Sequence, residues 1–430
     1  MSDYKPYPAY KDSGVEWLGK VPDGWEVVPI KYLVIYIGSG KTPTGGGEAY
    51  QDRGILFLRS QNIFNDGLHL DDVVYISEEI DNTMGISRVL PGDVLLNITG
   101  ASIGRTCLVP ENIGRANVNQ HVCIVRTINN GMGLWVSKFF QSNVIKEQVD
   151  YFQTGAGREG LNFQEISNFV ISFPSVKEQL LICEFLDHET ARIDALTSKK
   201  SRFIELLREK RQALITQAVT RGLDPNIKMK GSGVEWLGEV PEHWEIVPLK
   251  YNLKLVSDRA TSREFAIALE NIESWTGKFI QTNNDFEGHG VAFSNGDILF
   301  GKLRPYLAKV YLADSKGEAV GDFFVLRPTK KIYPRFAQYQ ILSEEFIKNI
   351  DGSTYGAKMP RVNWEFFGDM PFSTPDFSEQ KIIAIFLDRE TTRIDSLISK
   401  TQHSINLLKE RRAALITAAV TGQIDVRNTA

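Results

Sequence analysis

Cysteine is scarce in this sequence and long apolar runs are absent, and each deficiency narrows what the protein can be. Cys107, Cys123 and Cys183 are odd in number and lack a C-x-x-C spacing, so neither a disulfide framework nor a zinc site is indicated. No apolar stretch reaches the roughly 18 residues of a membrane span, and the N-terminal MSDYKPYPAYKDSG lacks the apolar core of a secretion signal. We therefore expect a cytoplasmic protein with three buried thiols and no membrane partner.

Motifs of common DNA-modifying and nucleotide-binding enzymes are also missing. There is no NPPY- or DPPY-like tetrapeptide, which a base amino-methyltransferase of the usual type needs, and the six histidines form no metal-binding spacing. GSGKT at 38–42 ends like a P-loop, but Ile35 stands where the opening glycine is required. A nuclease core of the D…ExK kind is too degenerate to exclude by inspection. The sequence thus predicts no catalytic and no metal-binding residue.

The charge balance is not that of a typical DNA-binding protein. The 430 residues carry 49 Lys and Arg against 53 Asp and Glu, a net charge of −4. Proteins that hold DNA alone usually carry a basic surplus. If this chain binds nucleic acid, its basic groups must be concentrated on one face, or partner subunits must neutralise many of the phosphates.

What the sequence does contain is a duplication. SGVEWLGKVPDGWEVVPIK at 13–31 returns as SGVEWLGEVPEHWEIVPLK at 232–250, with 14 of 19 positions identical. A second repeat pairs 178–224 with 379–425, with 27 of 47 positions identical. The stretches enclosed by these repeats have diverged strongly. Two similar frames that hold two different inserts suit a molecule that reads two different things at a fixed separation.

The second repeat predicts two long helices. Residues 178–221 contain no proline, and apolar residues recur there at spacings of seven, three and four, which is typical of a coiled-coil seam. Two such helices in one chain most simply bury their stripes against each other as an antiparallel pair; alternatively, each packs on its own domain. The expected seam residues are Leu186, Ile193, Leu196, Phe203, Leu207, Leu214 and Ala218, and then Leu387, Ile394, Leu397, Leu408, Leu415 and Ala419.

Both inserts are expected to be rich in β-strand, because short apolar runs are flanked by Gly, Asn and Asp. PGDVLLNITGASIGRTCLV at 91–109 aligns with NGDILFGKLRPYLAKVYLA at 295–313, and TGAGREGLNF at 154–163 aligns with YGAKMPRVNW at 355–364. The inserts are therefore predicted to share a fold while their loop chemistry differs. The tryptophans of the repeated frames are interpreted as packing residues.

Three loops in each insert could present side chains to DNA. Arg and Lys suit guanine edges and phosphates, whereas Asn and Gln can make paired contacts with adenine. Ordinary turns with solvated polar residues would explain many of these positions equally well, and His121 is either a further contact or a satisfied histidine at a strand end. The candidate DNA-binding residues are Thr99, Ser102, Arg105, Asn117, Asn119, Gln120, Thr154 and Arg158, followed by Lys302, Arg304, Tyr306, Lys309, Tyr355, Lys358 and Arg361.

Taken in order, these segments resemble the specificity (S) subunit of type I restriction–modification systems. The resemblance rests on SGVEWLGxVPxxWE, GSGKTPTGG…GILFLRSQNI, GDVLLNITGASIGR, NQHV and EQ…IxxFLDxET…RID, and it spans nearly the entire chain. One departure is that the second insert has LVSDRATSRE at 255–264 in place of GSGKTPTGG. The loop geometry of the second insert is therefore less safely inferred than that of the first.

The resemblance implies an α+β fold. Two similar α/β target recognition domains would be joined by two long antiparallel helices, a coiled coil, in a pseudo-two-fold internal repeat with the chain ends close together. The implied segments are a docking segment at 1–24, recognition domain 1 at 25–175, a long helix at 176–222, a linker and repeated docking segment at 223–243, recognition domain 2 at 244–376, a second long helix at 377–422 and a tail at 423–430.

The resemblance also implies a non-catalytic function. Each recognition domain would read one half of a bipartite, asymmetric site in double-stranded DNA, and the coiled coil would set the spacer. Two modification subunits would bring S-adenosylmethionine and methylate adenine, and restriction subunits would bring translocation and cleavage with ATP and Mg. No cofactor is expected in this chain.

Three alternatives stay open on the sequence alone. The chain could be the specificity chain of a combined restriction–methylation enzyme, a stand-alone DNA methyltransferase or nuclease, or a coiled-coil scaffold without a nucleic-acid function. The missing NPPY-type motif argues against a methyltransferase. A scaffold leaves the divergence of the inserts unexplained.

Overall fold

The computed structural model describes residues 4–153, 160–260, 265–282, 290–354 and 359–427. By its internal contacts the chain divides into two units. Unit 1 consists of Met1–Lys199 together with Ser404–Ala430, and unit 2 consists of Lys200–His403. Each unit therefore combines one insert with part of each long helix.

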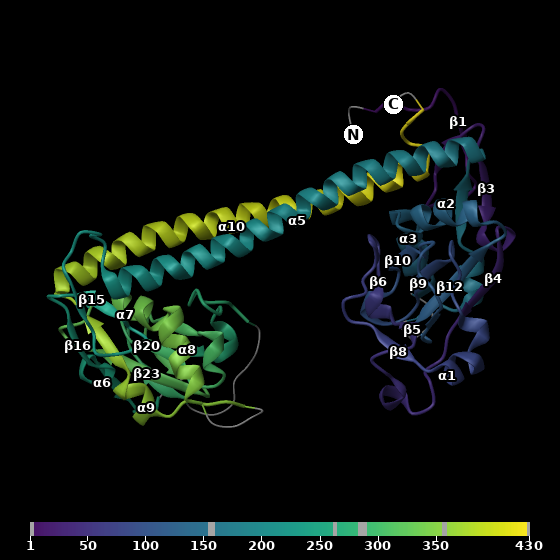
Figure 1. Ribbon diagram of the computed structural model, residues 1–430. Helices are drawn as coiled ribbons and strands as arrows, with labels where there is room; N and C mark the ends of the chain where they lie inside the picture. The colour runs from purple at the N-terminus through teal and green to yellow at the C-terminus, as the bar shows by residue number, and fades with distance from the viewer. Residues whose placement is uncertain (1–3, 154–159, 261–264, 283–289, 355–358, 428–430) are drawn as a thin grey trace. The chain divides into compact units, whose positions relative to one another are not determined.

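Unit 1 is built on two small sheets. The antiparallel sheet has the order β10 (Thr106–Leu108), β9 (Val94–Asn97), β12 (Val122–Thr127) and β4 (Val34–Ser39). The other has the order β11 (Ala116–Val118), β5 (Ile55–Leu58) and β8 (Val74–Ile76). Helix α2 (Asn130–Phe140) packs beside β9, β10 and β12, followed by α3 (Asn143–Gln153) (Figure 1). All four residues of β9 are buried, which explains why Val94, Leu95 and Leu96 follow one another as an apolar run without alternation.

Unit 2 repeats this arrangement. Its larger sheet has the order β17 (Leu253–Val256), β23 (Phe323–Pro328), β20 (Ile298–Gly301) and β21 (Val310–Leu312), the same order as in unit 1. The smaller sheet has the order β18 (Ala266–Ile267), β22 (Gly317–Ala319) and β19 (Val291–Phe293). A parallel pair is kept in both small sheets, β11 with β5 and β22 with β18. The third strand pairs with β5 in unit 1 but with β22 in unit 2, so the inserts share a frame and differ beside it.

The two long helices are α5 (Val176–Arg221) and α10 (Phe377–Val420). In unit 1 the first part of α5 lies beside the last part of α10 and runs the opposite way, with Arg412 bound to Asp194 (Figure 1). In unit 2 the last part of α5 lies beside the first part of α10, with Arg211 bound to Asp395. The expected antiparallel pairing is therefore present in each unit.

The predicted seam is correct at the ends of α5 and wrong in its middle. Leu186 and Ala218 are buried as expected, but Leu196 and Phe203 are 44% and 45% exposed, and Ile204 is buried instead at 5%. On α10, Leu397 is likewise exposed. Phe203 and Ile204 are adjacent apolar residues, so apolar spacing alone does not decide which of the two is buried.

The repeated segments at 13–31 and 232–250 pack against the recognition domains. Trp25 and Trp244 are 2% and 0% exposed, which confirms that they are packing residues. The two terminal segments meet in unit 1, where the Tyr10 hydroxyl donates to the Gly422 carbonyl at 2.9 Å. The expectation that the chain ends lie close together is thus confirmed.

Two further expectations concern the cysteine thiols and membrane-spanning helices. The thiols of Cys107, Cys123 and Cys183 are free and buried. Within the described part of the chain, no helix is both long enough and apolar enough to cross a bilayer.

Candidate nucleic-acid interface

Three loops of unit 1 meet beyond the end of β9. The Ile98 amide donates to the His121 carbonyl at 3.0 Å, and the Leu161 amide donates to the Ile98 carbonyl at 2.9 Å. The loop after β9 turns at Gly100 and Gly104, whose φ angles of 71° and 83° lie in the left-handed region that favours glycine. The backbone therefore brings the loop after β9 together with the segment that contains Gln120 and with Leu161.

Four polar side chains form a continuous chain on this surface. The Thr42 hydroxyl donates to Oε1 of Gln120, Nε2 of Gln120 lies 2.9 Å from Nε2 of His121, and Nδ1 of His121 lies 2.6 Å from Oγ1 of Thr99. These contacts run without a break from Thr42 through Gln120 and His121 to Thr99. The structure thus groups Thr99 and Gln120, two predicted residues, with Thr42, which belongs to the GSGKT segment and was not among the candidate DNA-binding residues.

Arg105 is presented on an aromatic support. Its guanidinium lies 4.8 Å from the centre of the Phe64 ring, which stacks on His69 with centroids 4.0 Å apart. Stacking limits the rotamers of the exposed arginine and leaves its donors free to meet a guanine edge or a phosphate. Ser102 also belongs to this loop, where its hydroxyl accepts from Asn97 Nδ2 at 3.1 Å.

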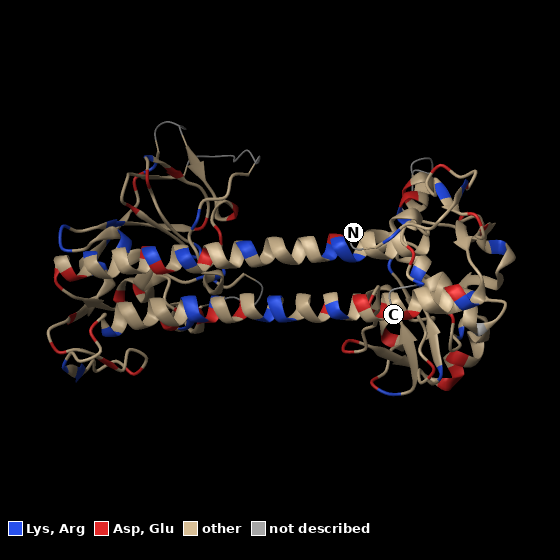
Figure 2. Ribbon diagram, turned by 90° about the horizontal axis from the view of Figure 1, so that it is seen from above, with Lys and Arg blue, Asp and Glu red and all other residues tan. Residues whose placement is uncertain are grey.

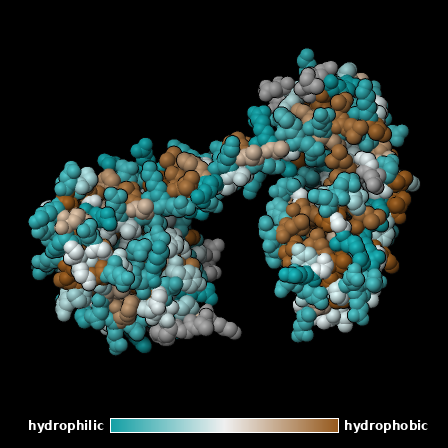
Figure 3. Space-filling view, in the orientation of Figure 1, coloured by the Kyte–Doolittle hydropathy of each residue, from teal (hydrophilic) through white to brown (hydrophobic). Residues whose placement is uncertain are grey.

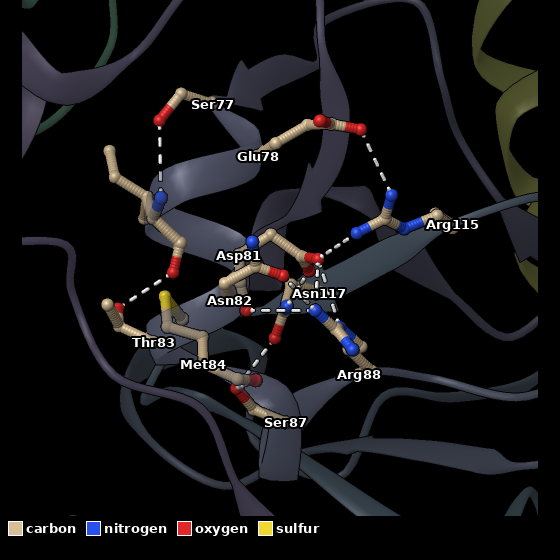
Figure 4. Close-up of polar contacts among 11 residues, drawn as sticks. Ser77, Glu78, Asp81, Asn82, Thr83, Met84, Ser87, Arg88, Arg115 and Asn117 are labelled. Carbon is tan, nitrogen blue, oxygen red and sulfur yellow. Dashed lines mark hydrogen bonds and ion pairs between the residues drawn. The ribbon is translucent and has the colours of Figure 1, made fainter.

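Asn117 was predicted to contact a base, but the structure uses it inside the domain. Its side chain is 0% exposed and donates to Asp81, on α1 (Glu78–Thr83), at 2.6 Å, while it accepts from the Ser87 hydroxyl at 2.6 Å (Figure 4). Asp81 is also bound by Arg88 and Arg115. Burial opposes ionisation of Asp81, but the hydrogen bonds from its two arginines and from Asn117 lower its pKa overall. Asn117 is therefore a structural residue with no free group for DNA.

Asn119 has a similar role in the loop backbone. It is 9% exposed, its Oδ1 accepts from the His121 amide at 3.1 Å, and its carbonyl accepts from the Gly40 amide at 3.2 Å. A Cβ on Gly40 would lie 1.6 Å from the Val118 carbonyl oxygen, so glycine is required at this contact. The GSGKTPTGG segment therefore packs against the recognition loops and is not a nucleotide-binding loop of the P-loop kind.

The loop after β20 in unit 2 follows the path of the loop after β9. The Lys302 amide donates to the Asp322 carbonyl at 2.9 Å, and the Val362 amide donates to the Lys302 carbonyl at 3.1 Å. Arg304 and Ala308 have φ angles of 51° and 46°, values that side chains with a Cβ rarely adopt. The guanidinium of Arg304 is exposed and has no hydrogen-bond or ion-pair partner among the described residues.

The other predicted residues of unit 2 differ in how they are held. Arg361 donates to Asp322 at 2.8 Å, and Lys302 lies 3.8 Å from the same carboxylate. Tyr306 is 43% exposed. Lys309 points inward, where its ammonium donates to the Leu269 carbonyl at 2.6 Å and burial lowers its pKa, so it serves the loop and is not free to reach DNA.

Four predicted residues lie outside the described part of the chain. They are Thr154, Arg158, Tyr355 and Lys358.

The repeated Gly-Asp before β9 and β20 has a structural role that its sequence alone did not reveal. Asp93 binds Arg126 through two hydrogen bonds of 2.7 and 2.8 Å, and Asp297 binds Arg327 through two of 2.9 and 2.7 Å. Each pair joins neighbouring strands of the larger sheet. Both domains therefore keep the same internal ion pair while their exposed loops differ. No group of three or more His, Cys, Asp or Glu that could hold a metal ion occurs among the residues that the structure describes.

Two versions of one α+β domain, each with a different polar loop surface and each joined to antiparallel helices, define a protein with two recognition domains of one kind. The chain belongs to the family described as the type I restriction modification DNA specificity domain, whose model matches residues 22–206 and 242–407. The resemblance seen in the sequence motifs is thereby confirmed.

Relatives and solved structures agree with this assignment. The type I restriction enzyme MjaVIII specificity subunit of Methanocaldococcus jannaschii is 23% identical over 430 residues, which cover 95% of each chain. The EcoDI specificity subunit of Escherichia coli is 22% identical over 284 residues, covering 60% of this chain and 63% of that protein.

Two solved structures have a similar fold. A chain from a study of complex assembly and conformational transition of the type I R-M system matches with a TM-score of 0.68 at 13% identity, covering 94% of this chain and 99% of that one. The HsdS subunit from Thermoanaerobacter tengcongensis matches with a TM-score of 0.50 at 14% identity, covering 94% and 98%. The expected α+β fold class is thereby confirmed.

Proposed function

We propose that this chain is the non-catalytic specificity subunit of a type I restriction–modification complex, in which each unit reads one half of a split, asymmetric DNA target. The observation that carries the proposal is the contrast between the two loop surfaces. The unit 1 surface combines the neutral side chains of Thr99 and Gln120 with one cation, Arg105. In unit 2, Lys302 and Arg361 lie beside Asp322, and Arg304 adds a further positive charge. Different donors and acceptors on one backbone frame favour different bases.

Repeated apolar side chains on the helices support a protein partner present in two copies. Val176 and Phe377 occupy equivalent positions of the repeat and are 66% and 45% exposed, and Leu206 and Leu407 are 46% and 49% exposed. Apolar residues are visible on the surface of the helical region in Figure 3. Because these exposed apolar residues occur at equivalent positions of both helices, they suit two copies of a modification subunit. Those subunits would supply S-adenosylmethionine and methylate adenine. Restriction subunits would add cleavage with ATP and Mg.

The charge distribution is consistent with recognition loops that bind DNA and helices that bind protein. Figure 2 shows that Lys and Arg alternate with Asp and Glu along both helices, so the helices present no continuous basic stripe. With a net charge of −4, this subunit would depend on partner subunits for much of the phosphate neutralisation.

The decisive experiment is to map adenine methylation across a genome after co-expressing this chain with its modification subunit. A single split motif, methylated on each strand only when this chain is present, is the expected result and would also identify the target. The control is the modification subunit alone. A soluble complex that methylates no motif would favour a scaffold, and methylation or cleavage by this chain alone would overturn its non-catalytic role.

A further inference from the structure

One arginine on α10 joins three parts of unit 1. Nε of Arg412 donates to both carboxylate oxygens of Asp194 on α5, at 3.0 and 3.2 Å. Its Nη2 donates to the Asn65 carbonyl at 3.3 Å. Asn65 lies at the turn of the hairpin formed by β6 (Ile63–Phe64) and β7 (Gly67–Leu68). A single guanidinium thus links both helices to the recognition domain.

An arginine on α5 does the same in unit 2. Nε of Arg211 donates to Oδ1 of Asp395 on α10 at 3.2 Å, and its Nη1 donates to the Trp275 carbonyl at 3.0 Å. Trp275 lies between Ile272 and Phe279, which are bridged to each other. The Arg211 side chain is only 7% exposed, against 15% for Arg412, so the contact in unit 2 is the more deeply buried.

The helix residues of these two contacts are the same and the hairpin residues are not. Arg211 and Arg412, like Asp194 and Asp395, occupy equivalent positions of the helical repeat. The acceptor in each hairpin is a main-chain carbonyl, which every residue possesses. The part of the contact that both units share therefore tolerates divergence of the recognition domain. Unit 2 adds a side chain of its own, because Nζ of Lys278 in the hairpin lies 2.7 Å from Oδ2 of Asp395.

Each hairpin is in turn one hydrogen bond away from a recognition loop. Oδ1 of Asn65 accepts from the amide of Thr106, the residue after Arg105, at 2.9 Å. The Trp275 amide donates at 3.1 Å to the carbonyl of Ala308, which ends the loop that begins at Arg304. Displacement of either hairpin would therefore displace the side chains that face DNA.

We propose that Arg211 and Arg412 are positioning residues that lock each recognition domain to the helical pair. The inference rests on the proposed function, since the consequence concerns DNA. With the lock in place, the DNA-facing loops of each unit keep one orientation on the helices, and only one spacing between the half-sites fits. Without these hydrogen bonds, each domain can adapt to a wrong spacing at a lower cost in free energy. Binding to the correct spacing becomes weaker, because the domain is no longer preorganised.

The test uses the complex of this chain with its modification subunit and DNA targets whose spacer is correct or one base pair longer. Arg211→Ala and Arg412→Ala are expected to reduce the ratio of the two affinities by about tenfold, the effect of losing a hydrogen bond to a charged group. The larger change is expected for Arg211→Ala. Arg202→Ala is the matched control, because among the described residues this exposed arginine on α5 pairs only with Glu205 and Glu209 of its own helix.

A general loss of stability would lower both affinities together and leave their ratio unchanged, and that result would overturn the proposal. Arg211→Lys and Arg412→Lys retain the charge but cannot hold the carboxylate and the carbonyl with one planar fork, so they test the same point if the alanine variants do not fold. In the alanine and lysine variants, the backbone amides of the affected hairpin, 63–68 in unit 1 or 272–279 in unit 2, should exchange with deuterium faster than in the wild type. This exchange is measured without DNA, so it separates failure of the lock from failure of the proposed function.

Discussion

Arg304 and Gly100 occupy the same place in the two units, and both adopt a left-handed backbone, with φ angles of 51° and 71°. The same holds for Ala308 and Gly104, at 46° and 83°. The fold therefore requires this conformation at both positions, and glycine satisfies it without steric cost in unit 1. An arginine at such a position costs stability, and the proposed contact with DNA would account for its presence there.

Arg304→Gly should consequently stabilise the protein and damage recognition. Relief of the left-handed strain is expected to raise the free energy of unfolding by about 1 kcal/mol, while the affinity for the second half-site falls about tenfold or more. Thermal unfolding and binding to targets altered in one half at a time measure the two effects. Ala308→Gly, which removes strain nearby but no exposed side chain, should leave recognition intact. Losing stability and binding together would refute this role for Arg304.

Arg105→Ala should weaken recognition of the first half-site alone. The guanidinium rests 4.8 Å from the Phe64 ring, so Phe64→Ala should produce a smaller loss at the same half-site by freeing the arginine rotamers. An affinity loss of about tenfold is expected for Arg105→Ala, measured by binding to targets altered in one half. An equal loss at both halves would contradict the assignment of one half-site to each unit.

Asp81→Asn should destabilise unit 1 near neutral pH. Asp81 is fully buried and bound by Arg88 and Arg115, and its pKa is lowered relative to the unfolded chain. Its ionised form therefore contributes stability above the unfolded pKa of about 4, and this contribution is lost as the pH falls through the lower, folded pKa. The substitution should cost about 3 kcal/mol at pH 7 and progressively less in acid.

Amide exchange of β5 and β11 as a function of pH measures the cost of Asp81→Asn. Asp71→Asn, at an exposed position, is the control and should change stability by less than about 0.5 kcal/mol. A pH-independent cost would show that the charge of Asp81 is not the stabilising feature.

The three thiols should resist alkylation in the native protein. Burial raises the pKa of Cys107, Cys123 and Cys183 to about 12, so almost no reactive thiolate is present at pH 8. Mass spectrometry after iodoacetamide treatment should find three unmodified cysteines, and all three should react in denaturant. Rapid native labelling of any one would show that its site opens.

Properties that depend on local or repeated patterns can be predicted from the sequence. The apolar periodicity of 178–221 is carried by the residues themselves, and it predicts both α5 and the equivalent helix of the repeat. The duplication, with the weaker similarity of 91–109 to 295–313, likewise predicts two units that share a fold, although the order of the smaller sheet differs between them. The repeated frames, together with motifs such as GDVLLNITGASIGR and NQHV, carry the resemblance that leads to the family.

The direction in which each loop residue points cannot be predicted in this way, because partners distant in the chain decide it. Asn117 in β11 and Gln120 in the loop that follows are only three residues apart, yet Asn117 turns inward because Asp81, 36 residues earlier, needs a buried donor. Lys309 turns inward for the same kind of reason, toward a carbonyl 40 residues away.

Long-range contacts also set how each recognition domain is held on the helices. The hydrogen bonds of Arg412 with Asp194 and Asn65 span 218 and 347 residues. The repeated architecture and the chemistry available to each loop thus follow from the order of the amino acids alone. Which side chains stay free to meet DNA is set by tertiary packing, since a buried polar group requires a partner that local patterns do not reveal.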